Sequence, residues 1–327
     1  MNRDIVVIGA SAGGVDALQR LVAHLPQDLN ASIFVALHTY AWSGALMARI
    51  LKRAGDMDVR YAENGDTIQR GRIYLAPPDH HLLMEGDRMQ VVRGPKENGH
   101  RPAIDPMFRS AAVNYGPRVI GVILTGYLND GTSGLIAVKQ GGGATVVQDP
   151  DDAQVPDMPR SALDQAEVDH CAPLAEMPQL LVRLVGTPVE REGSDLAVPD
   201  SVKTESRIAA MECLHTEVVD ELGSRSPLTC PDCHGVLWEV NNDKMLRYRC
   251  HAGHATTAEV LSLDQAEAVE KALWIALKTL EESATLARRM AERAKTDKES
   301  FSRKLLEDRA RDAENNAATI RSILMKL

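Results

Sequence analysis

The sequence predicts an α/β protein with a doubly wound, mostly parallel sheet, followed by two smaller units. Short apolar runs rich in Val and Ile alternate with helical patterns through residues 4–187. Such alternation is typical of parallel strands that are buried on both faces and joined by helices. Cysteines and histidines gather at 230–254, and residues 257–327 contain no Gly or Pro. The last segment is therefore expected to form long helices.

The elements of the α/β part follow from its apolar periodicity. Runs at 5–8, 32–37, 72–75, 119–124 and 144–148 predict strands, and amphipathic segments at 15–25, 45–54, 106–114 and 134–140 predict helices. An antiparallel hairpin is expected at the edge of the sheet. Its strands are expected at 72–76, at 81–84 and, after the EGD turn at 85–87, at 89–92.

Four regions are expected along the chain. Residues 1–187 form the α/β domain, and 188–228 form a polar linker with one short helix near 202–222. Residues 229–256 form a zinc-ribbon-like module. Residues 257–327 form an amphipathic helical hairpin or coiled coil, because Ala and larger apolar residues recur at steps of three and four from 266 to 290 and from 306 to 327.

Composition and charge restrict the class of protein. The net charge is −9, and acidic residues outnumber basic ones both in 1–187 and in the remainder, which argues against a nucleic-acid partner. No apolar leader opens the chain, and no apolar run is long enough to span a bilayer. We therefore expect a cytoplasmic protein without membrane insertion, in which the five cysteines are reduced or bound to metal.

The stretch IVVIGASAGG at 5–14 admits two functions. A dinucleotide-binding loop needs glycine where Ser11 stands and an acid at the end of the second strand, where His38 stands. Both requirements fail. The motif G-x-S-x-G between a strand and a helix instead predicts a turn that presents a nucleophilic serine, with helix N–H groups nearby to stabilise an oxyanion. A serine that only caps the helix is the plainer alternative.

His38 and Asp130 complete a candidate catalytic set with Ser11. His38 ends the second predicted strand, and Asp130 follows the strand at 119–124. Parallel strands end at one edge of a sheet, so the three side chains are expected there together. A nucleophilic serine needs a base, and the base needs an orienting carboxylate. The order Ser, His, Asp differs from that of α/β-hydrolases and predicts a different fold. A histidine at a strand end, or an Asp-Gly turn, is by itself uninformative.

Six ordered motifs resemble the catalytic domain of chemotaxis protein-glutamate methylesterases. Besides the histidine that closes the second strand, they are GASAGG at 9–14, GRIYLAPPDHHLL at 71–83, HRPAIDPMFRSAA at 100–112, LTGYLNDGTSGL at 124–135 and QDPDDAQVPDMPRSAL at 148–163. The resemblance implies a doubly wound domain with one antiparallel edge. It also implies hydrolysis of γ-glutamyl methyl esters on the cytoplasmic helices of chemoreceptors, with release of methanol, and deamidation of selected glutamines there.

The resemblance assigns roles to residues of this chain. Ser11 is the nucleophile, His38 is the general base and then the acid, and Asp130 orients His38. The backbone N–H groups of Ala12 and Tyr127 are expected to form the oxyanion hole. Catalysis then needs no metal and no other cofactor.

Three departures from the family pattern qualify that expectation. Tyr127-Leu128 replace the usual Met-Gly, and a leucine disfavours the positive φ that glycine allows. Thr39-Tyr40 stand where proline often follows the histidine. The chain also begins at the catalytic strand, which indicates a stand-alone form without the family's receiver domain. The alternative function is therefore that of a catalytically weak or inactive relative, which acts as a scaffold or binding module in a chemosensory-type signalling pathway.

The C-terminal half suggests a metal site and a helical surface. The motifs CPDC and CHAGH place Cys230, Cys233, Cys250 and His254 at the ligand spacing of a structural zinc site. His234 and His251 are weaker ligand candidates, and a redox pair or unused thiols are alternatives. Cys171 and Cys213 are expected to be buried or partly buried. The terminal helices are expected to pair within the chain, with dimerisation or docking to a receptor bundle as alternatives.

Overall fold

The structure is a computed structural model that describes residues 2–39, 46–189, 198–213, 215–240, 245–294 and 300–326, with side chains from residue 302 in the last range. The chain divides into two compact units, Met1–Val260 and Leu261–Leu327, and each is described by itself. Tyr40, noted above as a departure, and Ala45, the expected first residue of a helix, lie outside the described residues.

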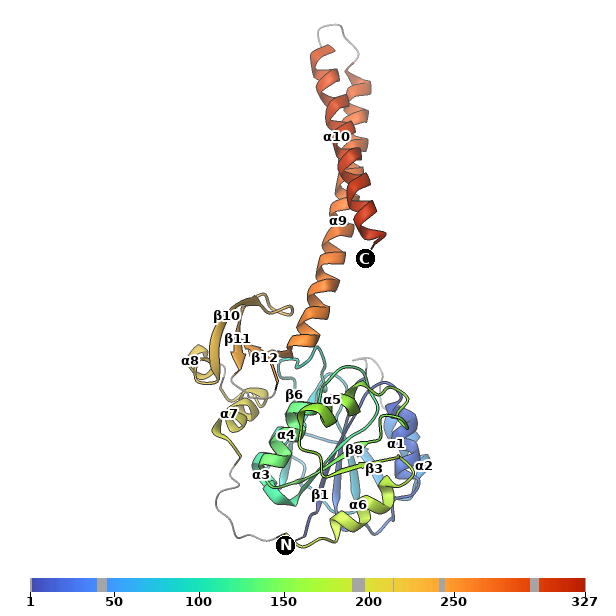
Figure 1. Cartoon of the computed structure of the whole chain (residues 1–327), viewed down its shortest axis with the longest axis vertical. Helices are drawn as coiled ribbons and strands as arrows, with labels where there is room; N and C mark the ends of the chain where they lie inside the picture. Colours follow the sequence, from blue (N-terminus) through green and yellow to red (C-terminus); the bar gives the residue numbers. More distant parts are fainter. Residues whose placement is uncertain are drawn as a thin grey trace. The chain divides into compact units, whose positions relative to one another are not determined.

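A seven-stranded sheet forms the centre of the first unit (Figure 1). Its strands are β1 (Ile5–Ala10), β2 (Ser32–Leu37), β3 (Asp58–Tyr61), β4 (Arg72–Leu75), β7 (Val119–Ile123), β8 (Ala144–Gln148) and β9 (His170–Ala172). They lie in the order β3-β4-β2-β1-β7-β8-β9, and every neighbouring pair is parallel. β1 and β2 are buried along their whole length, which explains their largely apolar sequences.

Helices cover both faces of this sheet and create two cores. They are α1 (Gly14–Val22), α2 (Leu46–Ala54), α3 (Ile104–Tyr115), α4 (Thr132–Gln140), α5 (Asp157–Gln165) and α6 (Met177–Val185), with a 3-10 turn, Gly116–Arg118, after α3. α1, α2 and α6 pack on the face that carries Ile8, and α3, α4 and α5 pack on the face that carries Val7. Successive residues of β1 thus serve opposite cores. The predicted doubly wound α/β fold is confirmed.

The antiparallel hairpin lies outside the main sheet. β5 (His81–Glu85) and β6 (Arg88–Val92) pair with each other as a separate two-stranded sheet. The hairpin is therefore present, but it does not form an edge of the main sheet as expected, and the arm expected at 72–76 is the parallel strand β4. β5 instead packs against α3. The Asn114 side chain donates to the Met84 carbonyl at 2.8 Å, and the Met84 N–H donates to Ser110 Oγ at 3.2 Å.

A second sheet occupies the C-terminal part of the first unit. The single helix expected near 202–222 is two helices, α7 (Asp200–Ala209) and α8 (Thr216–Asp220), because Met211 takes a left-handed φ of 62° just after α7. β10 (Gly223–Thr229), β11 (Val236–Val240), β12 (Arg247–Cys250) and β13 (Ala255–Thr257) form a four-stranded antiparallel sheet. The small module thus begins at Gly223, inside the segment expected to be linker.

Two long helices, α9 (Ala258–Arg293) and α10 (Ser300–Leu324), account for the second unit. Ion pairs Arg288–Glu314 and Arg321–Glu281 show that the two helices are antiparallel, so the predicted hairpin is confirmed. The buried seam is Leu277, Ala284, Ala287 and Ala291 on α9 and Ala310, Ala313 and Ala317 on α10. The seam expected on α9 was partly wrong, since Val269 and Met290 are exposed. Among the described residues, no helix combines the length and apolarity needed to cross a bilayer.

Candidate functional site

Ser11 lies in the tight turn between β1 and α1. Its N–H donates to the Thr125 carbonyl at 3.0 Å, and its carbonyl accepts from the Gly14 N–H at 2.8 Å. Gly13 takes a φ of 77°, and a Cβ at this position would lie 2.7 Å from the Gln154 side-chain oxygen. The turn that presents Ser11 therefore requires glycine two residues later.

His38 follows the last residue of β2 and joins Ser11 to Asp130. Its Nδ1 lies 3.1 Å from Ser11 Oγ, and its Nε2 lies 2.7 Å from Asp130 Oδ2. β2, β1 and β7 are neighbours in the sheet, so their C-terminal ends bring the three predicted side chains together. The position after β2, where a dinucleotide site would need an acid, is thus held by a histidine that contacts Ser11.

Asp130 is buried and held by several donors. Besides His38, the Ile104 N–H donates to Oδ2 at 2.7 Å, and Asn98 Nδ2 donates to Oδ1 at 2.9 Å. Burial alone would raise the pKa of Asp130, but the hydrogen bond and charge interaction with His38 and the Ile104 N–H hold it well below its usual range. An ionised carboxylate only accepts hydrogen bonds, so His38 Nε2 carries a hydrogen and Nδ1 offers its lone pair to Ser11. This is the tautomer that a general base requires.

His100 covers one face of the His38 ring. The two ring centroids lie 3.7 Å apart with planes 13° from parallel. Burial and the neighbouring His38 lower the pKa of His100 to about 4, so His100 is neutral near pH 7. Sequence reasoning missed this residue as part of the site, although it opens the HRPAID motif, because it does not end a strand.

A loop from 95 to 103 runs beside this site, and the buried His81 holds both of its ends. His81 Nε2 lies 2.8 Å from the Pro95 carbonyl, and the Ala103 N–H donates to His81 Nδ1 at 3.2 Å. Burial lowers the pKa of His81, which therefore stays neutral. The neutral ring donates at one nitrogen and accepts at the other. Asn98 and His100, which both adjoin the predicted catalytic residues, belong to this loop.

The candidate oxyanion donors lie in the two turns around Ser11. Among the described residues, neither the Ala12 N–H nor the Tyr127 N–H has a hydrogen-bond acceptor. A Cβ on Gly126 would lie 2.7 Å from Ser11 Cβ, so the loop before Tyr127 closely approaches the serine. Leu128 takes a φ of 63°. This is the left-handed region that a glycine would adopt freely, and a leucine occupies it at a cost of about 1–2 kcal/mol.

A second cluster of side chains lies in the small antiparallel sheet. The ligand atoms of Cys230, Cys233, Cys250 and His254 all lie within 4.8 Å of one another. The Sγ atoms of Cys233 and Cys250 are 3.6 Å apart, and Cys250 Sγ lies 3.5 Å from His254 Nδ1. Tetrahedral zinc with Zn–S bonds of about 2.3 Å holds its sulfur ligands roughly 3.8 Å apart. The four residues therefore fit a metal ion.

The other predicted cysteine and histidine positions are also placed by the structure. Gly253 has a φ of 93°, and its N–H bonds to the Cys250 carbonyl, so the chain turns back and brings His254 rather than His251 or His234 to the cluster. Cys213 is buried as expected, whereas Cys171 is exposed. β9, which carries Cys171, is an edge strand of three residues with only β8 beside it.

Comparisons with known proteins identify similar chains. A putative protein-glutamate methylesterase/protein-glutamine glutaminase from Leptospira interrogans (strain Fiocruz L1-130) is 39% identical over 185 residues, which are 56% of this chain and 96% of that protein. A protein-glutamate methylesterase/protein-glutamine glutaminase from Pyrococcus abyssi is 35% identical over 187 residues. That match covers 56% of this chain and 51% of the relative, so the chain spans about half the relative's length.

The fold and the family model point the same way. The crystal structure of the Thermotoga maritima CheB methylesterase catalytic domain matches with a TM-score of 0.55 and 33% identity, over 57% of this chain and 100% of that one. The family model described as CheB methylesterase matches residues 6–181, which is more than half of the sequence. This chain therefore belongs to the CheB methylesterase family.

Proposed function

We propose that this protein hydrolyses γ-methyl esters of glutamate residues in a protein substrate and releases methanol, with Ser11 as the nucleophile. The observation that supports this most directly is the chain of contacts from Ser11 Oγ through His38 to Asp130, at 3.1 and 2.7 Å. Relatives from L. interrogans and P. abyssi carry the double name protein-glutamate methylesterase/protein-glutamine glutaminase. The same side chains are therefore proposed to deamidate glutamine as well.

In the acylation step, Ser11 Oγ attacks the ester carbonyl carbon while His38 Nδ1 takes the hydroxyl proton. The oxyanion of the tetrahedral intermediate accepts hydrogen bonds from the N–H groups of Ala12 and Tyr127. The intermediate then collapses, and the methoxide leaves with the proton from His38 as methanol. Asp130 holds the imidazole in place and stabilises its protonated form.

In the deacylation step, a water molecule takes the position of the departed methanol. His38 accepts a proton from this water, which attacks the glutamyl-serine ester. Collapse of the second intermediate passes that proton from His38 to Ser11 Oγ and releases the glutamic acid product, which becomes the carboxylate by losing its remaining proton to solvent. For a glutamine substrate, ammonia leaves in place of methanol, and the rest of the scheme is unchanged. No cofactor takes part in either step.

The substrate is proposed to be a methylated helical bundle of the chemoreceptor type, encountered in the cytoplasm. α9 and α10 are proposed to form the surface through which two copies of the chain dimerise, because Val269, Trp274 and Ile275 are exposed on α9.

A structural zinc ion is proposed to be held by Cys230, Cys233, Cys250 and His254. Four protein ligands leave no open position for chemistry, and zinc would stabilise a sheet too small to have a large apolar core.

Methanol release from a methylated receptor fragment tests the proposed activity. We expect the wild-type protein to remove methyl groups, as measured by mass spectrometry, and Ser11→Ala to lose at least roughly 10³-fold of that rate. The matched control is Ser32→Ala, which starts β2 at the end opposite His38 and loses one hydrogen bond to the Gln69 carbonyl. Equal rates for wild type and Ser11→Ala would exclude Ser11 as the nucleophile. A metal-to-chain ratio near zero after chelator-free purification would exclude zinc.

A further inference from the structure

The small antiparallel sheet and the residues that follow it contact two of the chain segments that adjoin Asp130. On one side, the Asn98 N–H donates to the Ala255 carbonyl at 2.8 Å, and the Thr257 N–H donates to Asn98 Oδ1 at 3.1 Å. On the other side, Thr257 Oγ1 donates to Asn129 Oδ1 at 3.0 Å, and Asn129 Nδ2 donates to Glu259 at 2.8 Å. Residues 255–259 therefore connect the cysteine–histidine cluster, whose last member is His254, to the surroundings of Asp130.

Asn98 carries the more direct of these connections. Its side chain is buried, and Nδ2 donates to Asp130 Oδ1 at 2.9 Å and to Asp105 Oδ2 at 3.2 Å. Burial and the charge of Asp130 raise the pKa of Asp105 to about 7, so the amide lies between two carboxyl groups that compete for ionisation. The left-handed φ of 51° at Asn98 is one that asparagine tolerates well.

The Thr257 N–H determines which way the Asn98 amide points. In a reversed amide, the Asn98 oxygen would face the carboxyl oxygens of Asp105 and Asp130, which are acceptors. Its NH₂ group would face the Thr257 N–H, which is a donor. The observed orientation gives each amide atom a complementary partner. The small sheet thus sets the donor that meets one oxygen of Asp130, while His38 meets the other oxygen.

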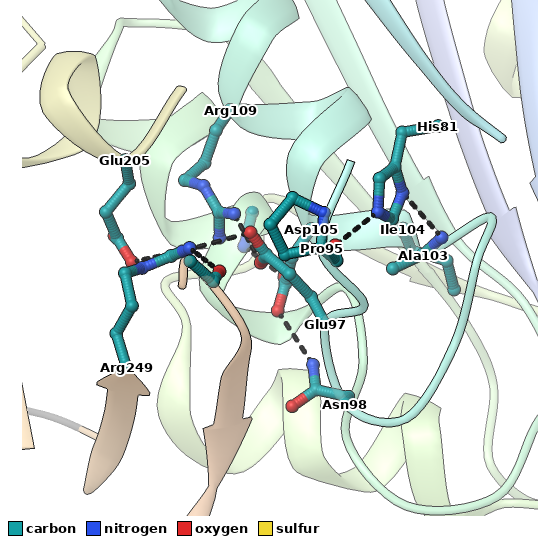
Figure 2. A network of polar contacts seen from close by, with 12 residues as sticks. His81, Pro95, Glu97, Asn98, Ala103, Ile104, Asp105, Arg109, Glu205 and Arg249 are labelled. Carbon is teal, nitrogen blue, oxygen red and sulfur yellow. Dashed lines mark hydrogen bonds and ion pairs between the residues drawn. The ribbon is translucent and has the colours of Figure 1, made fainter. Parts of the chain in front are cut away.

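A buried network of charges holds the same loop to the sheet. Figure 2 shows Arg249 of β12 between Glu205 of α7 and Glu97, and Arg109 of α3 pairs with the other oxygen of the same Glu97 carboxylate. Arg249 donates to Glu97 at 3.0 Å, to Glu205 at 2.9 Å and to the Gly253 carbonyl at 2.7 Å. Gly253 lies between two cluster residues, and Glu97 precedes Asn98, so both ends of the connection are anchored.

Resting on the function proposed above, we propose that the cysteine–histidine sheet is part of the active site, and that Asn98 is a positioning residue through which it orients Asp130. A metal ion held by the cluster would fix His254 and, next to it, the Ala255–Thr257 strand. Asn98 does not touch the reacting atoms. It acts by holding the Asp130 carboxylate in the orientation in which Oδ2 accepts the hydrogen bond from His38 Nε2.

The first test compares Asn98→Ala with Asn30→Ala, which removes a surface amide that accepts a bond from Arg70. The imidazole of His38 is titrated by NMR in each protein. In Asn98→Ala the Asp130 carboxylate loses a donor, so more of its charge acts on His38 and favours the protonated ring. We expect the His38 midpoint to rise by roughly half a pH unit or more, and labelling of Ser11 by a serine-reactive phosphonate to slow about tenfold near pH 7. Asn30→Ala should match the wild type in both measurements.

The second test removes the metal from the wild-type protein by chelation, with a colorimetric chelator to measure its release. We expect the same upward shift of the His38 midpoint, and no further shift when Asn98→Ala is treated in the same way. A midpoint that is unmoved by Asn98→Ala, or by complete metal release from the wild type, would overturn the proposal even if labelling slowed. Because the titration does not depend on ester hydrolysis, it decides this question separately from failure of Ser11 to react.

Discussion

Replacing Arg249 with methionine is expected to lower the free energy of unfolding of the first unit by about 3–5 kcal/mol. The guanidinium is fully buried and makes three hydrogen bonds, to Glu97, Glu205 and the Gly253 carbonyl. A hydrogen bond to a charged group contributes roughly 1.5–3 kcal/mol. Methionine keeps much of the volume, and each glutamate retains one arginine, Arg109 or Arg247. Three such bonds sum to about 4.5–9 kcal/mol. No carboxylate is left unpaired, so the expected loss lies at or somewhat below the low end of that range.

Urea denaturation of the full chain measures this change. Trp238 lies in β11 and is buried, so its fluorescence reports on the first unit once Trp42 and Trp274 are replaced with phenylalanine. Lys139→Met is the matched control, because Lys139 pairs with Asp169 near the surface at 2.5 Å, and such pairs contribute at most about 1 kcal/mol. A loss in Arg249→Met no larger than in this control would refute the idea that the buried network holds the loop to the sheet.

Three further variants test the site itself. His100→Phe keeps a ring against His38 but removes a group whose pKa is lowered to about 4. An unfolded histidine binds a proton near pH 6.5 and the folded one only near pH 4, so wild-type stability falls as the pH drops through that interval, by up to about 3 kcal/mol, and the variant should lose less between pH 7 and 4.5 in urea denaturation. Gly126→Ala would bring a Cβ to 2.7 Å from Ser11 Cβ and 2.2 Å from Met158 Sδ, so phosphonate labelling of Ser11 should slow by at least about tenfold, and unchanged labelling would contradict this close approach. Leu128→Val should be less stable than Leu128→Gly by about 1–2 kcal/mol in the same denaturation assay, because a β-branched residue is poorly tolerated at the φ of 63°.

The sequence was sufficient to place Ser11, His38 and Asp130 together because their proximity follows from the topology of the sheet. Once the strands are parallel, residues that follow them must meet at one edge. The cysteine–histidine cluster was equally accessible, since ligand spacing within short motifs is a local property. Asn98 carried no comparable signal. A single asparagine in a loop has no periodicity, and its partners Asp130 and Thr257 are distant in the sequence.

Two errors in the predicted fold have a common physical cause: the local sequence pattern distinguishes poorly between buried and exposed positions. The seam on α9 was misplaced because alanines occur on several of its faces, and alanine is compatible with either a buried or an exposed position. β3 and β9 were not predicted, since they are short edge strands with partly exposed residues. Edge strands lack the continuous apolar run that marks a strand buried on both faces.

The position of Asn98 limits how the small sheet can influence catalysis. Without its Thr257 partner, the Asn98 amide is no longer held in one orientation, and Asp130 loses a donor. The Ser11 N–H bond to the Thr125 carbonyl and the Gly126 N–H bond to the Val155 carbonyl do not involve the small sheet and remain. Asp130 does not contact the substrate in the proposed mechanism. A partner or chelator that displaces residues 255–257 is therefore expected to lower kcat and to leave KM nearly unchanged, because an interaction that matters only in the transition state is lost. An increase in KM alone would instead place the small sheet at the substrate-binding surface.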